Sequence, residues 1–207
     1  DYKKVLILGY GASGKAVENV LNAYDIDYVI YDKNKSIPNC ANKINKKIIK
    51  GVDLAVLSPG ISVYSKVVRK LIKYGIKVIS EIEFGYYFCK SKIIAVTGTN
   101  GKTTTSSLIY HILKSAGANV ALLGNIGTPF SNISNSNADV AVVEVSSFQL
   151  EAVEHFKPDI AVLLNIAPDH IDRHGTIENY ANTKFEIFKN QTSLDHCILT
   201  RSVSGYH

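Results

Sequence analysis

The chain has 207 residues, 46% hydrophobic and 20% charged, which suits one large or two small globular domains and excludes a disordered segment. The net charge is +5 with scattered lysines, so we expect no nucleic-acid partner. Cys40, Cys89 and Cys197 lie far apart without a CxxC pair, which excludes a disulfide framework and a cysteine zinc site. No apolar run approaches membrane-spanning length, and the chain opens on a strand-like segment instead of a signal peptide. We therefore expect a cytoplasmic monomer without membrane insertion.

A glycine-rich turn follows the first predicted strand, residues 5–8, and precedes a helix expected at 15–24. Gly9, Gly11 and Gly14 form a GxGxxG pattern, and Asp32 closes the next strand, 28–31, 18 residues after Gly14. Such glycines permit a tight turn and let a diphosphate approach the helix N-terminus. The residues alone predict a dinucleotide site with Asp32 on a ribose hydroxyl, although a UDP-sugar presents the same diphosphate. Lys33 and Lys35 either assist anionic groups or lie in solvent, and for Lys35 the solvent position is favoured.

The rest of the first unit continues this alternation of strands and helices. We expect strands at 54–57 and 77–79, helices at 66–74 and 81–88, and a linker at 89–92. Alternation of this kind favours a parallel sheet with crossover helices. The predicted fold class is therefore α/β, with a Rossmann-like domain over residues 1–90.

A second unit begins with a strand at 93–96 and a helix at 102–116 that ends before Gly117. The remaining predicted elements are strands at 120–123, 140–145, 160–164 and 197–199 and a helix at 179–189. The polar stretch 131–137 is expected to form an exposed loop, and the tail 201–207 shows no clear element. Since a P-loop sheet usually needs more strands than remain, we expect a truncated P-loop ATPase domain over residues 91–207.

The connection between strand 93–96 and its helix has the composition of a phosphate-binding loop. Backbone N–H groups at such a turn and helix N-terminus point at phosphate oxygens, and the helix dipole adds positive potential. Lys102 would reach the β- and γ-phosphates, and the Thr103 hydroxyl would ligate Mg²⁺. A generic phosphate loop has glycine where this chain has Val96. The alternative to a phosphate-binding loop is an ordinary glycine turn capped by threonine. The predicted ATP-binding residues are Gly98, Thr99, Asn100, Gly101, Lys102, Thr103 and Thr104.

Two acidic positions follow apolar strands. Glu144 ends the strand at 140–143, where a P-loop enzyme places its Mg²⁺ carboxylate; a surface glutamate is the alternative. Residues 169–174 hold two histidines, two aspartates and an arginine, and imidazole and carboxylate are both metal ligands. Asp172 and His174 either ligate metal or fix the loop. From the residues alone, Lys184 is interpreted as an ordinary helix cation, because an ammonium cannot ligate Mg²⁺.

Taken together, these segments resemble the Mur ligases of peptidoglycan precursor synthesis, in particular their D-glutamate-adding branch. Residues 97–104 match the phosphate loop of this superfamily, and this form of the loop explains why Val96 stands where a generic loop has glycine. Residues 124–127, 144–151 and 169–174 resemble the D-glutamate branch, and residues 9–14 and 58–61 resemble its N-terminal domain. The resemblance covers residues 1–200 in order.

The resemblance implies an ATP-dependent acid–amino-acid ligase. ATP would phosphorylate the carboxylate of UDP-N-acetylmuramoyl-L-alanine, and the amine of D-glutamate would attack the acyl phosphate to form an amide. The glycine turn would then hold UDP instead of NAD. The implied UDP-substrate residues are Gly11, Ser13, Gly14, Asp32, Lys33, Ser58 and Gly60, with Asn125, Ser146 and Gln149 facing the muramyl-peptide part.

The same resemblance implies a catalytic group of Lys102, Glu144, His170 and Lys184 that works with ATP and Mg²⁺. Magnesium would be held by Thr103, Glu144 and His170, and by Lys184 once this lysine is carbamylated. A carbamate turns the cation into an anion, and two Mg²⁺ ions would neutralise repulsion between the γ-phosphate and the substrate carboxylate. The carbamate is implied by the resemblance alone.

Two departures from the family pattern lead to alternatives. The family's C-terminal amino-acid-binding domain is absent, and residues 202–207 match nothing in it, so we expect a fragment, or a sequence joined across a gap, that is inactive alone. One alternative is a truncated, non-catalytic UDP-sugar or nucleotide-binding module. Another is an NAD-dependent oxidoreductase, which leaves residues 98–104 and 169–174 unexplained.

Overall fold

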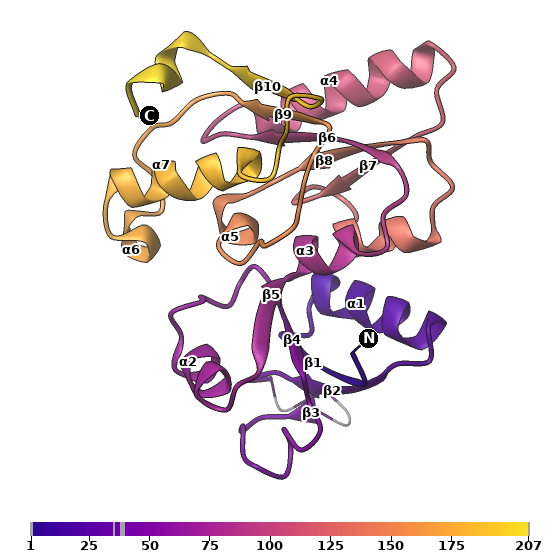
Figure 1. The fold of residues 1–207 in the computed structure, drawn as a ribbon, viewed down its shortest axis with the longest axis vertical. Helices are drawn as coiled ribbons and strands as arrows, with labels where there is room; N and C mark the ends of the chain where they lie inside the picture. Colours follow the sequence, from indigo (N-terminus) through magenta and orange to yellow (C-terminus); the bar gives the residue numbers. More distant parts are fainter. Residues whose placement is uncertain (1, 35, 38–39, 207) are drawn as a thin grey trace.

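The computed structural model describes residues 2–34, 36–37 and 40–206 and contains two five-stranded parallel sheets. Figure 1 shows them as two lobes, with the N-terminal lobe below the C-terminal one. The expectation of an α/β chain with two parallel-sheet units is confirmed. Lys35 lies outside the described residues, so its predicted solvent position is not addressed. In the part of the chain that is described, no helix is both long and apolar enough to cross a bilayer.

The first sheet has the order β3-β2-β1-β4-β5. Its strands are β1 (Lys4–Leu8), β2 (Asp27–Tyr31), β3 (Cys40–Ala41), β4 (Leu54–Leu57) and β5 (Lys77–Ser80). Helix α1 (Ala12–Ala23) covers one face, where Val17 and Leu21 pack against Ile7. Helix α2 (Lys66–Lys73) covers the other face, where Leu71 packs in the cluster of Leu6. Central strands covered on both faces read as continuous apolar runs, which explains the sequence pattern.

The second sheet has the order β10-β9-β6-β8-β7. Its strands are β6 (Lys92–Thr97), β7 (Val120–Gly124), β8 (Val140–Glu144), β9 (Ile160–Leu163) and β10 (His196–Leu199). The α-helices of this half are α4 (Lys102–Ser115), α5 (Ser147–Leu150), α6 (Ile171–His174) and α7 (Ile177–Phe185). Because β6 pairs with β8 and β9, the carboxyl ends of these three strands meet at one edge of the sheet.

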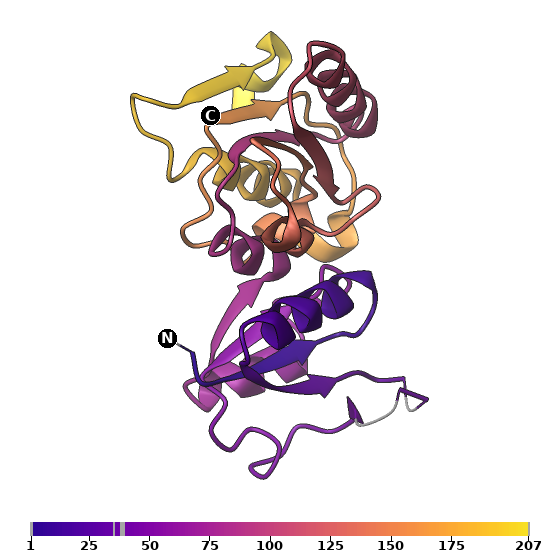
Figure 2. The same cartoon turned by 90° about the vertical axis from the view of Figure 1, so that its right-hand side faces the viewer.

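Helix α3 (Glu81–Tyr86) carries the chain from one sheet to the other and lies between the lobes (Figures 1 and 2). It packs against η1 (Phe130–Asn135), a 3₁₀-helix in which Phe130, Ser131 and Ile133 are buried. The expectation of an exposed loop at 131–137 is therefore wrong for its first part. The physical reason is that the Ser131 N–H donates to the buried Glu81 carboxylate (2.6 Å), a long-range contact that local composition does not encode.

Short elements account for the other differences. The helix expected at 179–189 begins at Ile177 and ends at Phe185, and a 3₁₀-helix, η2 (Glu186–Phe188), follows it. The tail expected to lack structure forms η3 (Arg201–Tyr206), and His207 lies outside the described residues. The prediction also omitted β3, α5 and α6, each of four residues or fewer. Such segments are too short to show a hydrophobic period.

Candidate functional site

The phosphate loop connects β6 to α4 and is held in place by the segment that follows β9. Gly98 has a φ of 152° and Gly101, which caps α4, a φ of 83°. The Asn165 side-chain oxygen accepts from the Asn100 N–H (2.9 Å), and its backbone oxygen accepts from the Thr99 N–H (3.0 Å). The Asn165 side-chain amide donates back to the Asn100 oxygen (3.0 Å). The loop is therefore fixed by its neighbouring strand before any ligand arrives.

Two lysines converge on the phosphate loop. The Lys102 ammonium donates to the backbone oxygens of Gly98 and Thr99, both at 2.8 Å. Lys184, on α7, donates to the same Gly98 oxygen at 3.0 Å. Both lysine side chains thus bond to one carbonyl, and the Lys102 ammonium places positive charge where a polyphosphate would lie.

Lys184 is buried, with 1% of its surface exposed, and its Nζ lies 4.6 Å from the centre of the Tyr180 ring. Burial, followed by the charge of Lys102, lowers its pKa from 10.5 to about 7, while Asp169 acts in the opposite direction. The interpretation of Lys184 as an ordinary helix cation is therefore wrong. A substantial share of this side chain is a neutral amine at neutral pH.

Glu144 ends β8 and is almost completely buried, with 2% exposed. One of its oxygens accepts from the Thr103 hydroxyl of α4 (2.7 Å), and the other accepts from the Asn125 amide that follows β7 (2.8 Å). Three separate elements thus meet at one carboxylate. The alternative of a surface glutamate is excluded by this burial. Thr104 lies exposed in the first turn of α4.

His170 is the N-cap residue of α6 and has a φ of 51°, a left-handed conformation that is uncommon outside glycine. Its Nε2 lies 3.5 Å from an Asp169 oxygen, and its ring centre lies 4.7 Å from that of Phe148 and 6.5 Å from that of Tyr180. The Tyr180 hydroxyl lies 3.2 Å from the Thr99 hydroxyl. His170 therefore meets the phosphate loop through Tyr180, whereas Thr103, Glu144 and Asn125 touch directly.

His174 and Asp172, for which the sequence left two roles open, have different environments. His174 is buried, its Nε2 lies 3.1 Å from the Ser147 hydroxyl, and burial lowers its pKa. It is therefore a neutral side chain that fixes α6 against α5. Asp172 lies exposed in the first turn of α6.

A cavity of about 670 Å³ lies over the glycine turn at the carboxyl edge of the first sheet. The predicted residues that line it are Gly11, Ser13, Asp32, Lys33, Ser58 and Gly60. Gly14 is buried beneath the turn, where a Cβ would overlap the Gly9 carbonyl oxygen. This position thus permits close packing of helix and strand and does not line the cavity.

Asp32 organises the turn beneath the cavity. Its carboxylate accepts from the backbone N–H of Asn34 (2.8 Å) and of Tyr10 (2.7 Å), and these bonds lower its pKa. The carboxylate is therefore ionised at neutral pH and holds the glycine turn against the end of β2.

Ser146 and Gln149 pair with each other at the start of α5. Gln149 is 2% exposed, and its side-chain oxygen accepts from the Ser146 N–H (2.9 Å) and hydroxyl (3.0 Å). The two residues form a capping box directly after Glu144. Their expected contact with a muramyl peptide remains a prediction.

Asn165 and Tyr180 were missed at the sequence level. Asn165 does follow an apolar strand at its carboxyl end, the position where α/β sites gather, so a signal was present. Tyr180 had none, because a tyrosine on a helix is usually a core residue.

Family models match two parts of the chain. Residues 3–80 match the N-terminal domain of Mur ligases of the MurD-like type, and residues 96–204, just over half of the chain, match the Mur ligase middle domain. The chain belongs to the Mur ligase family.

Among curated Mur ligases, the UDP-N-acetylmuramoylalanine–D-glutamate ligase of Thermoanaerobacter sp. (strain X514) is 41% identical over 213 residues. That alignment covers 95% of this chain and 47% of the relative. The ligase of the same name from Pelotomaculum thermopropionicum is 43% identical, with the same coverage. The chain thus spans about half the length of the curated relatives it matches.

Solved Mur ligases share the fold. The UDP-N-acetylmuramate:L-alanyl-gamma-D-glutamyl-meso-diaminopimelate ligase of Neisseria meningitides aligns with a TM-score of 0.65 at 18% identity, over 100% of this chain and 74% of that one. The UDP-N-acetylmuramate–alanine ligase of Thermotoga maritima aligns with a TM-score of 0.52 at 18% identity, over 96% of this chain and 53% of that one. At this identity the likeness concerns the fold alone.

Proposed function

We propose that this chain supplies the UDP-substrate and ATP sites of a ligase that adds D-glutamate to UDP-N-acetylmuramoyl-L-alanine through an acyl phosphate. The observation that carries the proposal is the contact of the phosphate-loop Thr103 with the buried Glu144, which also accepts from Asn125. A glycine turn with a purely structural role would not require a buried carboxylate next to it. The ligases named above for this reaction support the choice of substrates.

The residues at the phosphate loop fit ATP and magnesium. Lys102 and the N–H groups at the start of α4 would hold the phosphates, and the Thr103 hydroxyl and Glu144 carboxylate are oxygen ligands of the kind that Mg²⁺ prefers. Bound Mg²⁺ would offset the repulsion between the γ-phosphate and the substrate carboxylate. His170 is the further Mg²⁺ ligand that we propose, for a metal ion between ATP and the substrate carboxylate.

Lys184 would join the metal ligands after reaction with CO₂. Its amine nitrogen forms a bond to the carbon of CO₂, an electron pair moves onto oxygen, and the nitrogen loses one proton to water. The product is a carbamate anion. A pKa of about 7 supports the proposal, because the reaction needs the neutral amine.

In the first lobe, the cavity over the glycine turn would hold the UDP part. Two turns at the carboxyl edge of the sheet line this cavity. One contains Gly11 and Ser13, and the other contains Ser58 and Gly60. The use of ATP and a UDP-activated substrate favours a cytoplasmic protein, and we propose a monomer.

Phosphate release tests the proposal. With ATP, Mg²⁺, UDP-N-acetylmuramoyl-L-alanine and D-glutamate together, a polypeptide that carries this chain and a D-glutamate-binding domain should release phosphate and form the amide, and omission of any one component should stop release. The 207 residues alone should bind both nucleotides without turnover. Turnover by them alone would rule out the alternative of a non-catalytic binding module. Failure of the longer polypeptide with all components present would contradict the ligase proposal.

Glu144→Gln should weaken Mg²⁺-dependent ATP binding by about 10- to 100-fold while the fold is retained. Glutamine keeps the shape and one acceptor oxygen for the Asn125 amide, but it removes the negative charge that a metal ion needs. The measurement is calorimetric titration of ATP with and without Mg²⁺. The matched control is Glu186→Gln. Glu186 is a carboxylate on η2 that forms an ion pair with Lys189, and its substitution should leave the affinity for Mg²⁺–ATP unchanged. Equal Mg²⁺–ATP affinity in wild type and Glu144→Gln would argue against a metal ligand at this position.

A further inference from the structure

Arg173 belongs to α6 of the second lobe but donates to carbonyls of the first. Its Nη1 donates to the Pro59 oxygen (2.8 Å) and its Nη2 to the Ile61 oxygen (3.3 Å). The same guanidinium bonds to both oxygens of the Glu151 carboxylate, Nε at 2.9 Å and Nη2 at 2.5 Å. With 12% of the side chain exposed, this network is largely shielded from water.

On the first lobe, the contacted carbonyls belong to the turn that lines the UDP cavity. Pro59 and Ile61 both line the cavity, and the Ile61 N–H donates to the Ser58 oxygen (3.0 Å). The Ser58 hydroxyl in turn donates to the Gly9 oxygen of the glycine turn (2.9 Å). A shift of the arginine would therefore move one wall of the cavity.

On the second lobe, the same side chain contacts the surroundings of His170. The Arg173 backbone N–H donates to the His170 backbone oxygen (3.0 Å), so the two residues share one helical turn. The guanidinium carbon lies 3.9 Å from the centre of the Phe148 ring, which also packs against the His170 ring at 4.7 Å and the His174 ring at 5.8 Å. The Arg173 guanidinium thus contacts both Phe148, which packs against the proposed metal ligand His170, and the turn that lines the proposed UDP site.

The chemistry of this position needs arginine. A guanidinium offers five N–H donors in a plane, which lets it grip a carboxylate with two bonds, reach two carbonyls and stack on a ring at once. Lysine keeps the charge but has only a compact ammonium, which cannot hold both lobes in the same geometry.

We propose that Arg173 is a positioning residue that couples occupancy of the UDP cavity to the arrangement of His170 at the phosphate loop. This inference rests on the proposed function. When the UDP ligand fixes the turn at residues 58–61, the guanidinium holds α6 in the arrangement that receives Mg²⁺–ATP. Such coupling is reciprocal, so Mg²⁺–ATP should tighten binding of the UDP ligand by the same factor.

The test compares calorimetric affinities of wild type and Arg173→Lys for UDP-N-acetylmuramoyl-L-alanine, with and without saturating Mg²⁺–ATP. We expect Mg²⁺–ATP to tighten wild-type binding by about tenfold and to have no such effect in Arg173→Lys. The affinity for Mg²⁺–ATP alone should stay at the wild-type value, which a loss of structure at the phosphate loop would change. Glu151→Gln, which removes the charge that orients the guanidinium, should reduce the coupling in the same direction.

Lys77→Met provides the matched control. Lys77 also bridges the lobes, through an ion pair with Glu154, but it lies away from the residues that line the UDP cavity. Its substitution should leave the coupling intact. If both Arg173→Lys and Glu151→Gln kept the wild-type coupling, the inference about Arg173 would be overturned while the proposed function would stand. The same would hold if Lys77→Met lost the coupling to the same extent as Arg173→Lys. Absence of UDP-ligand binding by wild type would instead overturn the proposed function.

Discussion

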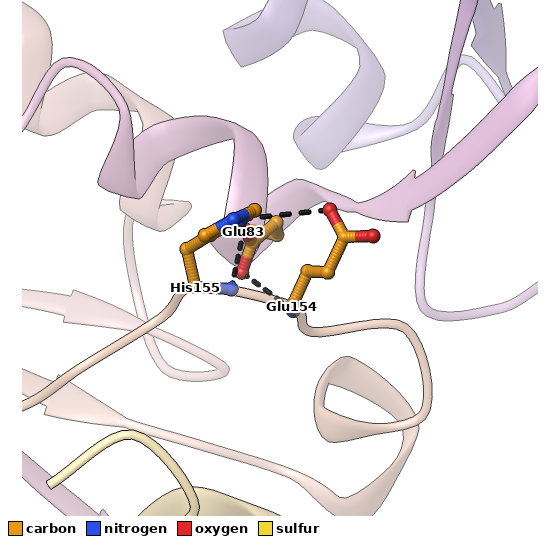
Figure 3. Close-up of side chains that lie close together, drawn as sticks. All are labelled: Glu83, Glu154 and His155. Carbon is orange, nitrogen blue, oxygen red and sulfur yellow. Dashed lines mark hydrogen bonds and ion pairs between the residues drawn. The ribbon is translucent and has the colours of Figure 1, made fainter.

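Replacing Glu83 with alanine is expected to lower the free energy of unfolding by about 3 to 5 kcal/mol. The Glu83 side chain on α3 is fully buried and accepts from three consecutive backbone N–H groups of the other lobe, those of Glu154 (2.9 Å), His155 (2.8 Å) and Phe156 (2.8 Å). Figure 3 shows the carboxylate between Glu154 and His155. Alanine would leave all three donors without their acceptor in the junction between the lobes.

The loss should depend on pH in a defined direction. Burial alone would raise the pKa of Glu83, but the three backbone N–H bonds outweigh it, and the pKa lies below the ordinary 4.5. A carboxylate with a lowered pKa stabilises the fold above 4.5, and this contribution disappears as the pH falls through the folded pKa. Urea unfolding at pH 7 and at pH 3 measures both the loss and its decline.

Glu83→Gln keeps one acceptor oxygen and should lose less stability than Glu83→Ala. Glu186→Gln, at a side chain that is 42% exposed, should unfold like wild type. A loss below about 1 kcal/mol for Glu83→Ala at pH 7 would contradict the assignment of Glu83 as an anchor between the lobes. The ligand atoms of Glu83, Glu154 and His155 lie within 4.8 Å of one another, a spacing that suits a metal. The backbone donors already occupy both Glu83 oxygens, so we assign this cluster to the anchor.

Replacing Lys184 with methionine is expected to raise the free energy of unfolding by about 2 to 4 kcal/mol below pH 7 in CO₂-free buffer. Lys184 is charged there in both the folded and the unfolded state, and the folded state bears the cost of burying the ammonium next to Lys102. Methionine fills a similar volume without charge. The bond to the Gly98 oxygen is lost, which makes the gain smaller than the full cost of burial.

The gain should shrink as the pH rises. Between the folded pKa of about 7 and the ordinary 10.5, the unfolded wild type binds more protons than the folded one, so wild-type stability increases with pH. Urea unfolding at pH 6 and at pH 9.5 should therefore give a large difference between the two proteins at the lower pH and a small one at the higher. Lys66→Met, at an exposed lysine of α2, should show no such trend. A pH-independent difference for Lys184→Met would contradict a lowered pKa.

The sequence predicted the parts of the site that depend on strand order. An apolar strand followed by Gly-Lys-Thr-Thr, and another that ends in Glu144, have their carboxyl ends at one edge of a parallel sheet, so Thr103 and Glu144 could be expected to meet. The cavity over Gly11 and Ser13 followed from the first glycine turn in the same way. These inferences succeed because local patterns determine which ends of the strands come together.

Contacts between distant segments could not be predicted in this way. The burial of Lys184 depends on how α7 packs over the phosphate loop, and the two carbonyls that Arg173 contacts in the other lobe lie more than a hundred residues away. The 3₁₀-helix at 130–135 is mostly polar in composition, yet Phe130, Ser131 and Ile133 are buried where Glu81 bonds to it. In each case the tertiary environment, and not the local period, determines the state of the residue.

A calorimetric titration of UDP-N-acetylmuramoyl-L-alanine into the chain in the presence of Mg²⁺–ATP tests the proposed function directly. We expect one molecule to bind per chain, in competition with UDP and without competition from NADH. Binding of NADH at the glycine turn, with no binding of the UDP ligand, would contradict the account.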